Sequence, residues 1–372
     1  MKILMTADTI GGVWTYALQL AKSLADYDAQ IELATLGAPL SASQHRSAAA
    51  LTNLTVHESS FRLEWMDDPW DDVRATGDWL RTLADRLSPD LVHLNDYSQG
   101  AMEWEVPVLM VAHSCVPSWY EAVRGAPAGS EWDRYRAHVS GGLAGADLVV
   151  APTAAMLDSL RRLYGPFRNS TVIYNGRDNP VARSEIKKDY ILTAGRLWDD
   201  AKNIGALDRA ARDVPWPICV AGATTHPNGG EVEFANLRRL GRLEPDAMDQ
   251  WFCSASIYVH PARYEPFGLA PLEAAQRGCA LVLADIPSLH ELWQDAALYA
   301  RPDCPAELAA ALNRLVDDPR LRREYAKRAG ARAARFSARR MGREYHSAYR
   351  GLLEASTPVI DRHPRLAASR SR

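Results

Sequence analysis

The stretch Ile257-Tyr-Val-His-Pro-Ala-Arg-Tyr-Glu-Pro-Phe-Gly-Leu-Ala-Pro-Leu-Glu-Ala-Ala-Gln-Arg-Gly278 contains the pattern of one strand, one loop and one helix. Its apolar, β-branched start predicts a buried strand that ends at a proline. Pro271 suits the first turn of a helix, and Gly278 suits its C-terminal cap. Glu265 lies in the loop and Glu273 in the first helical turn, at the carboxyl end of the strand. Open α/β sheets bind ligands at that end, so the stretch predicts an α/β fold with a ligand site here.

The same loop offers backbone N–H groups to a ligand. The amides of Phe267, Gly268 and Leu269 come just before or at the start of the helix. The free N–H groups and the dipole of a helix N-terminus favour a phosphate. Glu273 has two explanations, since it can complement the helix dipole or contact a ligand, and the stretch alone leaves both open.

Length and charge set the broad class of the protein. The 372 residues exceed one ordinary core, which predicts two domains. Residues 1–178 carry 14 basic and 22 acidic side chains, whereas the remainder has a net charge of +5. The second half is therefore the better host for an anionic ligand, and the acidic first half argues against docking on nucleic acid or anionic lipid.

The sequence also indicates the cellular compartment of the protein. No apolar run approaches the length of a membrane span, and the first residues have the pattern of a strand, not of a signal peptide. The five cysteines are scattered, which favours reduced thiols. We therefore expect a cytoplasmic protein without an integral membrane segment.

The first half opens with a strand at 2–7, a glycine loop and a helix at 13–24, as Rossmann-like units do. The dinucleotide fingerprint G-x-G-x-x-G is absent, which argues against NAD binding. Gly11-Gly12 is either a turn with positive φ or a place where a ligand approaches the backbone. Strands at 91–96 and 106–112 deliver Asp96 and His113 to the same sheet edge. His113 is either a structural residue or part of a site there.

The second half restarts the alternation of strands and helices. A strand at 190–194 leads into a loop with Arg196 and Lys202, just before a predicted helix at 204–212. These two cations are either a clamp for a diphosphate or solvated surface charges, and the loop alone does not decide. The acidic loop at 65–72 lacks a histidine partner, so we do not predict a metal site there.

Four segments of the second half belong together, namely Ala194-Gly-Arg-Leu197, Lys202-Asn203, Gly241-Arg242 and Arg263-Tyr-Glu-Pro-Phe-Gly-Leu-Ala-Pro-Leu-Glu273. As a set they closely resemble the retaining glycosyltransferases of family 4, whose mark is two glutamates with seven residues between them. Gly11-Gly12 and Val172-Ile-Tyr-Asn-Gly176 resemble the same family, so the resemblance extends over residues 1 to about 354.

The resemblance implies a GT-B fold, in which two facing Rossmann-like domains enclose a cleft for a nucleotide-sugar. The predicted parts are an N-terminal acceptor-side domain at 1–180, a C-terminal nucleotide-sugar domain at 181–338, a helix at 339–354 that crosses back to the first domain, and a disordered tail at 355–372.

It also implies roles for single residues. Arg196 and Lys202 would hold the donor diphosphate, Glu273 would bond the ribose, and Glu265 would address the transferred sugar. The predicted catalytic residues are His113, Glu265, Arg196 and Lys202. The predicted donor-binding residues are Gly12, Arg196, Lys202, Asn203, Gly241, Arg242, Leu243, Glu265, Phe267, Gly268, Leu269 and Glu273. The acceptor candidates are Trp14, Asp96, His113 and Trp119.

The implied reaction transfers a hexose, with retention of configuration, from a UDP-sugar or, as second choice, a GDP-sugar to a hydroxyl acceptor. We expect neither a metal nor another cofactor, because two cations and helix amides can stabilise the charge of the leaving diphosphate. The neutral loop at 9–14 and the acidic first half favour a soluble sugar or a small aglycone as acceptor. The alternatives are an epimerase of the same fold, transfer to a lipid or polysaccharide, a dinucleotide oxidoreductase, and a sugar-binding module without activity.

Overall fold

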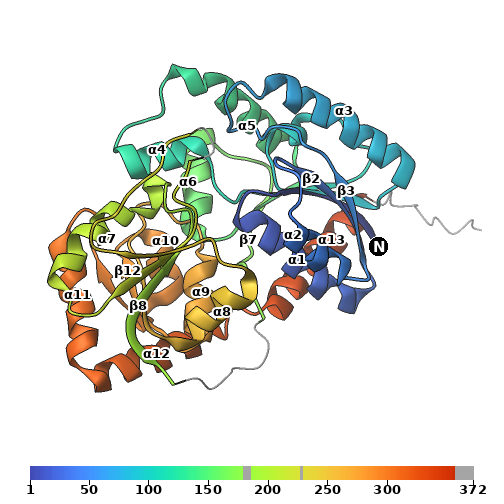
Figure 1. Cartoon of the computed structure of the whole chain (residues 1–372). Coiled ribbons are helices and arrows are strands. Elements are labelled where there is room, and N and C mark those ends of the chain that lie inside the picture. Colours follow the sequence, from blue (N-terminus) through green and yellow to red (C-terminus); the bar gives the residue numbers. More distant parts are fainter. Residues whose placement is uncertain (179–185, 227–228, 357–372) are drawn as a thin grey trace, which may run out of the picture.

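The computed structural model describes residues 1–178, 186–226 and 229–356. Two parallel sheets, each covered by helices, form two Rossmann-like domains that lie side by side (Figure 1). Each sheet has an apolar cluster on either face, so each domain has its own core. The predicted α/β class with two Rossmann-like domains is confirmed.

The first domain is built on seven parallel strands. These are β1 (Lys2–Asp8), β2 (Gln30–Leu36), β3 (Leu54–Glu58), β4 (Leu91–Leu94), β5 (Val108–Val111), β6 (Leu148–Ala151) and β7 (Ser170–Val172). Their order in the sheet is β3-β2-β1-β4-β5-β6-β7, so the chain reverses its direction of winding between β1 and β4. Ligands bind α/β sheets at such a switch point, outside the carboxyl ends of the strands.

Helices connect these strands. They are α1 (Gly12–Leu24), α2 (Ala42–Ala49), α3 (Trp70–Leu87), α4 (Val116–Arg124), α5 (Asp133–Gly145) and α6 (Ala154–Tyr164), with short 3-10 turns η1 (Ala25–Tyr27), η2 (Ser98–Ala101) and η3 (Ser130–Trp132). The Thr153 hydroxyl accepts a hydrogen bond from the N–H of Met156 at 3.2 Å, which caps α6.

The second domain has six parallel strands. These are β8 (Lys188–Ala194), β9 (Ile218–Ala221), β10 (Arg238–Gly241), β11 (Ala255–His260), β12 (Ala280–Ala284) and β13 (Ala297–Ala300). The order β10-β9-β8-β11-β12-β13 puts the switch point between β8 and β11. The helices are α7 (Ile204–Ala210), α8 (Pro245–Ser254), α9 (Leu269–Gln276), α10 (Pro287–Trp293), α11 (Pro305–Asp317) and α12 (Pro319–Ala333), and the 3-10 turns are η4 (Asp200–Lys202), η5 (Ala211–Asp213) and η6 (Gln294–Ala296).

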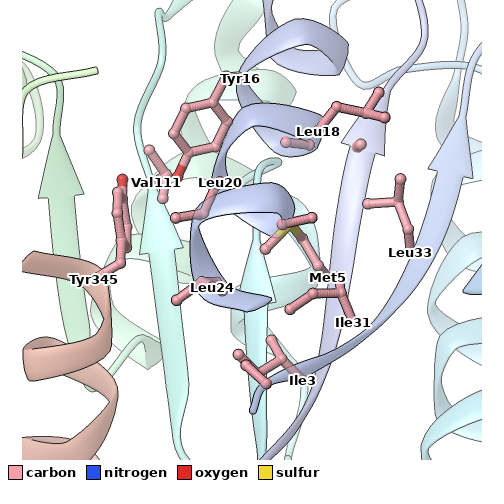
Figure 2. Close-up of a cluster of buried hydrophobic side chains, with 14 of the residues drawn as sticks. Ile3, Met5, Tyr16, Leu18, Leu20, Leu24, Ile31, Leu33, Val111 and Tyr345 are labelled. Atoms are coloured by element: carbon pink, nitrogen blue, oxygen red, sulfur yellow. The ribbon is translucent and has the colours of Figure 1, made fainter. Parts of the chain in front are cut away.

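The last helix, α13 (Ala338–Ser356), packs against α1 of the first domain. Its buried side chains Met341, Tyr345 and Tyr349 belong to the same apolar cluster as β1 and α1. Figure 2 shows Tyr345 next to side chains of α1, and its ring lies 6.0 Å from that of Tyr16. The two domains are thus tied together by the end of the chain as well as by its middle.

Two predicted features lie outside the described residues. They are the domain boundary at 180/181 and positions 357–372 of the predicted tail, whereas residues 355 and 356 end α13. None of the helices in residues 1–178, 186–226 and 229–356 combines the length and the apolar character needed to span a bilayer.

Candidate active site

The glycine loop of the first domain faces the second domain at the carboxyl ends of both sheets. Gly11 has a φ of 143°, and a Cβ atom built on it would lie 3.8 Å from Nη1 of Arg196. A Cβ atom on Gly12 would lie 3.8 Å from Cδ1 of Leu269, the first residue of α9. The loop is therefore a turn with positive φ, and it also brings the first domain's backbone close to the predicted donor residues.

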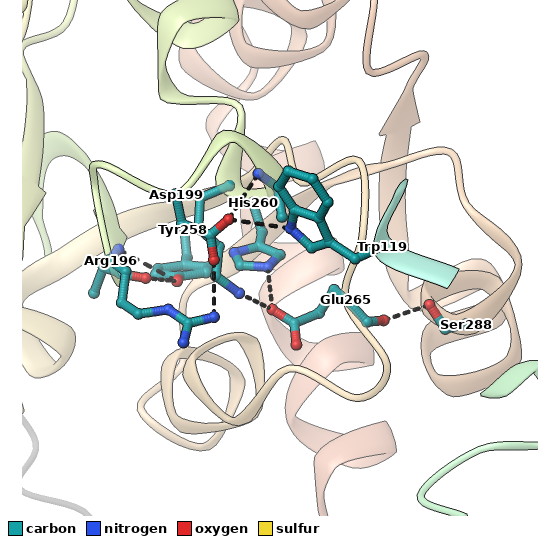
Figure 3. Close-up of polar contacts among 10 residues, drawn as sticks. Trp119, Arg196, Asp199, Tyr258, His260, Glu265 and Ser288 are labelled. Atoms are coloured by element: carbon teal, nitrogen blue, oxygen red, sulfur yellow. Dashed lines mark hydrogen bonds and ion pairs between the residues drawn. The ribbon is translucent and has the colours of Figure 1, made fainter. Parts of the chain in front are cut away.

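Lys202 and Glu265 form an ion pair in the second domain. Nζ of Lys202 lies 2.6 Å from Oε2 of Glu265, and the same oxygen accepts a hydrogen bond from Nε2 of His260 at 2.8 Å. The Ser288 hydroxyl donates to the backbone carbonyl of Glu265 at 2.6 Å (Figure 3). The side chains of Lys202 and Glu265 are only 17% and 13% exposed, so the pair is held in a fixed geometry.

The Glu265 side chain is an ionised carboxylate at neutral pH. Burial alone would raise its pKa, but the charge of Lys202 and the hydrogen bonds from His260 and Lys202 outweigh that effect and hold the pKa well below its ordinary value. No described residue donates a hydrogen bond to Oε1 of Glu265. That oxygen is free to accept one from a hydroxyl group of a ligand.

Arg196 is anchored by Asp199 in the same loop. Its Nη2 donates to Oδ2 of Asp199 at 2.8 Å, and the indole N–H of Trp119 donates to the other oxygen at 3.4 Å (Figure 3). The Asp199 side chain is 6% exposed, whereas that of Arg196 is 43% exposed. The guanidinium is thus aimed by a buried acid while part of it stays open to a ligand.

Asn203 shapes the loop that carries these cations. It has a φ of 55°, and its Nδ2 donates to the backbone carbonyls of Pro261 at 3.0 Å and Pro302 at 2.7 Å. Both amide hydrogens are used in a buried environment. The side chain of Asn203 therefore positions the loop, and the prediction that it contacts the donor is not supported by its orientation.

α9 begins at Leu269, earlier than predicted, so Glu273 lies just beyond the first helical turn in which the sequence placed it. Gly268 has a φ of 89° and is the N-cap residue, while the Phe267 side chain is buried in the core. Glu273 forms an ion pair with Arg177, which follows the last strand of the first domain. Burial raises the pKa of Glu273, and the charge of Arg177 opposes that rise. Arg177 escaped the sequence analysis because it lies 96 residues away from its partner.

The predicted donor-binding residues Gly241, Arg242 and Leu243, which the family resemblance places near the base of the donor, lie at the end of β10 and just after it. Gly241 has a φ of 71°, and its carbonyl accepts the N–H of Gly222 at 2.8 Å. Gly241 and Arg242 are exposed, and Leu243 is half-buried. No hydrogen bond or ion pair in the described part of the chain joins this segment to the Lys202 and Glu265 pair, so its role stays a prediction.

His113 stands at the carboxyl end of β5, in the first domain. Its Nε2 lies 2.8 Å from Oδ1 of Asn95, and its ring packs edge-on against Tyr16 with 4.6 Å between centroids. Burial lowers the pKa of His113 to about 3, so the imidazole is neutral at physiological pH. Asn95 was visible in the sequence only as one of the polar residues that end a strand.

The remaining acceptor candidates differ in their burial and contacts. The side chain of Trp14 is 7% exposed and packs in the core of the first domain, so its acceptor role stays a prediction without support from its burial. Asp96 points inward: its Oδ2 accepts the Thr6 hydroxyl at 2.7 Å, and its Oδ1 is buried without a partner among the described residues. Trp119 lies at the contact between the domains, bonded to Asp199 and covered by Arg124 with 5.2 Å from its Cζ to the ring centroid.

Direct contacts lock the domains together beside the site. The Tyr264 hydroxyl lies 2.7 Å from the hydroxyl of Ser118, and Thr153 donates to the carbonyl of Pro266 at 2.9 Å. The Glu291 carboxylate caps the N-terminus of α6, accepting two backbone N–H groups at 2.8 and 2.9 Å. Since Tyr264 and Pro266 flank Glu265, the arrangement of the domains is coupled to the position of that carboxylate.

A cavity of about 430 Å³ is lined by Trp198, Asp199, α7 and residues 232–234. Within residues 1–178, 186–226 and 229–356, three or more His, Cys, Asp or Glu side chains nowhere gather in a way that could hold a metal ion.

Both halves of the chain match known families. The model of Glycosyltransferase Family 4 matches residues 10–179, and that of Glycosyl transferases group 1 matches residues 188–318. The glycogen synthase of Mycobacterium tuberculosis is 29% identical over an alignment of 268 residues, which covers 62% of this chain and 61% of that protein. The chain thus spans about three fifths of the length of that relative.

Solved structures share the whole fold. The sucrose-phosphate synthase of Thermosynechococcus elongatus covers 96% of this chain and 100% of its own, with a TM-score of 0.76 and 18% identity. HepE of Anabaena, solved in complex with UDP-glucose, covers 95% and 100%, with a TM-score of 0.74 and 19% identity. These likenesses confirm the predicted GT-B fold. Because the two family models account for both domains and the fold agrees with them, this chain belongs to the glycosyltransferases of the GT-B fold, and its first domain matches the model of family 4.

Proposed function

We propose that this protein transfers a hexose from a nucleoside-diphosphate sugar to a hydroxyl group of a soluble sugar or small aglycone, with retention of configuration. The observation that carries the proposal is the Lys202 and Glu265 pair, held at 2.6 Å beside the start of α9. The glycine loop of the other domain faces the same helix start. A cation, a carboxylate and unpaired helix amides at one place suit a sugar diphosphate.

The diphosphate would be bound by Arg196, Lys202 and the first N–H groups of α9. Departure of a nucleoside diphosphate builds negative charge on phosphate oxygens, and fixed cations and helix amides stabilise that charge in the transition state. Asp199 and Glu265 hold the two cations in place before the donor arrives. We therefore propose that the transfer needs no metal ion, so saturating chelator should leave the rate unchanged.

The two glutamates would bind different parts of the donor. The free Oε1 of Glu265 suits a hydroxyl of the transferred sugar, because a carboxylate makes charge-assisted hydrogen bonds. Glu273, four residues into α9, suits the ribose, with Arg177 keeping its carboxylate oriented. His113, on the opposing domain, suits the sugar or the acceptor hydroxyl.

UDP is the favoured nucleotide, since HepE, with the same fold, was solved with UDP-glucose. The acidic first half and the neutral glycine loop support an uncharged soluble acceptor over an anionic lipid. The five cysteines, all within the described residues, are thiols outside any disulfide, which supports the reducing environment of the cytoplasm.

A thermal-shift panel of UDP, GDP and ADP, each alone and with common hexoses attached, would test the donor. We expect the largest stabilisation with a UDP-hexose, because a ligand that binds only the folded state raises its melting temperature. Absence of a shift with every nucleotide would overturn the donor site.

Turnover assays would then separate the reactions. Incubation with donor alone should give neither isomerised sugar nor rapid hydrolysis, and either product formed at the transfer rate would indicate an epimerase or hydrolase. Product formation only with a polyprenyl or inositol lipid would overturn the soluble acceptor while leaving the donor site intact. Nuclear magnetic resonance of the product would report the anomeric configuration.

A further inference from the structure

A buried chain of hydrogen bonds runs from α13 to His113. The hydroxyl of Tyr349 lies 2.6 Å from Nδ1 of His93, and Nε2 of His93 lies 3.3 Å from Oδ1 of Asn95. The same Oδ1 lies 2.8 Å from Nε2 of His113. His93, with 0% exposure, and Tyr349, also at 0%, are sealed from solvent, so their contact has no competition from water, whereas Asn95 and His113 are half-buried.

The orientation of the Asn95 amide is fixed by Thr6. Nδ2 of Asn95 lies 2.6 Å from the backbone carbonyl oxygen of Thr6, which can only accept a hydrogen bond. The backbone N–H of Asn95 donates to the Thr6 hydroxyl at 2.8 Å, and that hydroxyl donates to Asp96 at 2.7 Å. The amide nitrogen therefore faces Thr6, and the amide oxygen must face the two imidazoles.

This orientation decides where the histidine protons are. A carboxamide oxygen only accepts, so Nε2 of His113 carries hydrogen. Nε2 of His93 carries hydrogen for the same reason, and the Tyr16 hydroxyl, 3.4 Å away, can accept from it as well. Burial lowers the pKa of each ring to about 3. The neighbouring His113 ring lowers the pKa of His93 further, so both rings are neutral. Each Nδ1 is then a bare acceptor. That of His93 accepts the Tyr349 hydroxyl, whereas that of His113 has no partner among the described residues.

We propose that Asn95 is a positioning residue that holds His113 in its Nε2–H tautomer, and that Tyr349 supports Asn95 through His93. The geometry leaves Nδ1 of His113 as a fixed hydrogen-bond acceptor at the carboxyl end of β5. A substrate group that contacts Nδ1 of His113 must then be a hydrogen-bond donor, as a sugar hydroxyl is. This last step rests on the glycosyl transfer proposed above, but the tautomer does not.

The tautomer is measured directly by nitrogen-15 resonance of the full-length protein labelled at histidine, at neutral pH and without substrate. We expect the His113 ring to show a protonated Nε2 and a bare Nδ1, and the His93 ring to show the same. A His113 ring protonated at Nδ1, or at both nitrogens, would overturn the proposal whatever reaction the protein catalyses.

Two variants test the chain of contacts. Asn95→Leu removes the acceptor that the Nε2–H groups share, so His113 should become a mixture of tautomers. Tyr349→Phe removes one hydroxyl without adding volume, so the Nδ1 resonance of His93 should shift on loss of that hydrogen bond while His113 keeps its bond to Asn95. Unchanged imidazole resonances in a folded Asn95→Leu protein would contradict the assignment, and if that variant fails to fold, an unchanged His93 in Tyr349→Phe contradicts the supporting contact.

Kinetics separates positioning from mere stability. We expect Asn95→Leu to lower kcat by about 10- to 100-fold, as removal of the partner that orients a functional imidazole does, while the Kd for UDP stays the same. The matched control is Asn53→Leu, because Asn53 is a buried asparagine of the first domain whose Nδ2 donates to the carbonyls of Ala21 and Ala29. An equal loss of kcat in both variants would assign Asn95 a structural role only.

Discussion

Replacement of Lys202 by methionine gives the most informative test of the donor site. The change keeps the length of the side chain but removes the charge that lies 2.6 Å from Glu265. If Nζ also contacts the diphosphate, one charged hydrogen bond is lost, at about 1.5–3 kcal/mol. Binding of UDP should then weaken by about 10- to 100-fold, since 1.4 kcal/mol corresponds to a factor of ten.

The same change affects stability for a separate reason. Glu265 keeps its charge but loses a partner, while the hydrogen bond from His260 remains. Breaking a fully buried pair costs about 3–5 kcal/mol, and we expect about 2–3 kcal/mol here because the pair is partly exposed. Isothermal titration calorimetry with UDP and denaturant unfolding would report the two effects on the same protein.

Two further variants show why UDP binding changes in Lys202→Met. Arg263→Met is the matched control, because Arg263 lies two residues before Glu265 but its guanidinium pairs with Asp303 at 2.8 Å. The double variant Lys202→Met with Glu265→Gln removes the unpaired carboxylate and should regain stability without regaining UDP affinity. Recovery of affinity in the double variant would mean that repulsion by Glu265, and not loss of a contact from Lys202, had weakened binding. Full UDP affinity in folded Lys202→Met would refute the donor-site assignment.

The remaining predictions address the other residues of the site. Glu273→Gln should weaken binding of UDP by about 1.5–3 kcal/mol but leave binding of inorganic pyrophosphate unchanged, because pyrophosphate has no ribose; calorimetry with both ligands checks this. His113→Ala should lower kcat and spare the Kd for UDP, and a parallel loss of UDP affinity would argue against its place opposite the phosphates. The pKa of Glu265 is held below its ordinary value of 4.5, so the folded state binds fewer protons than the unfolded chain around that pH. Its stabilisation is complete above about pH 4.5 and declines as the pH falls, so the difference in unfolding free energy between wild type and Glu265→Gln should shrink in acid; a difference that grows in acid would reverse the sign of the argument. Tyr264→Phe removes a hydroxyl that lies 2.7 Å from Ser118 across the domains, and should lower the free energy of unfolding by about 1 kcal/mol with the Kd for UDP little changed.

Much of the site could be predicted because its residues are close in sequence. The strand, loop and helix of residues 257–278 lie in the structure as β11, a loop and α9, with Gly278 at a φ of 78° just beyond the helix. Parallel strands bring their carboxyl ends to one edge, so polar residues at strand ends are expected together without knowledge of the packing. The family resemblance joined Arg196 and Lys202 to the glutamates, and the structure places Nζ of Lys202 2.6 Å from Glu265.

Contacts between distant segments were beyond the sequence. A pattern of apolar spacing marks Trp14 as helical, but only packing decides that its ring faces the core. Arg177 meets Glu273 and Tyr349 meets His93 because the domains dock and α13 returns to the first domain. Sequence therefore determined the kinds of groups at each strand end, since these depend on local backbone geometry. Tertiary structure alone decided which donor meets which acceptor, and hence the protonation of His113, because hydrogen bonds depend on positions within a few tenths of an ångström that no local pattern specifies.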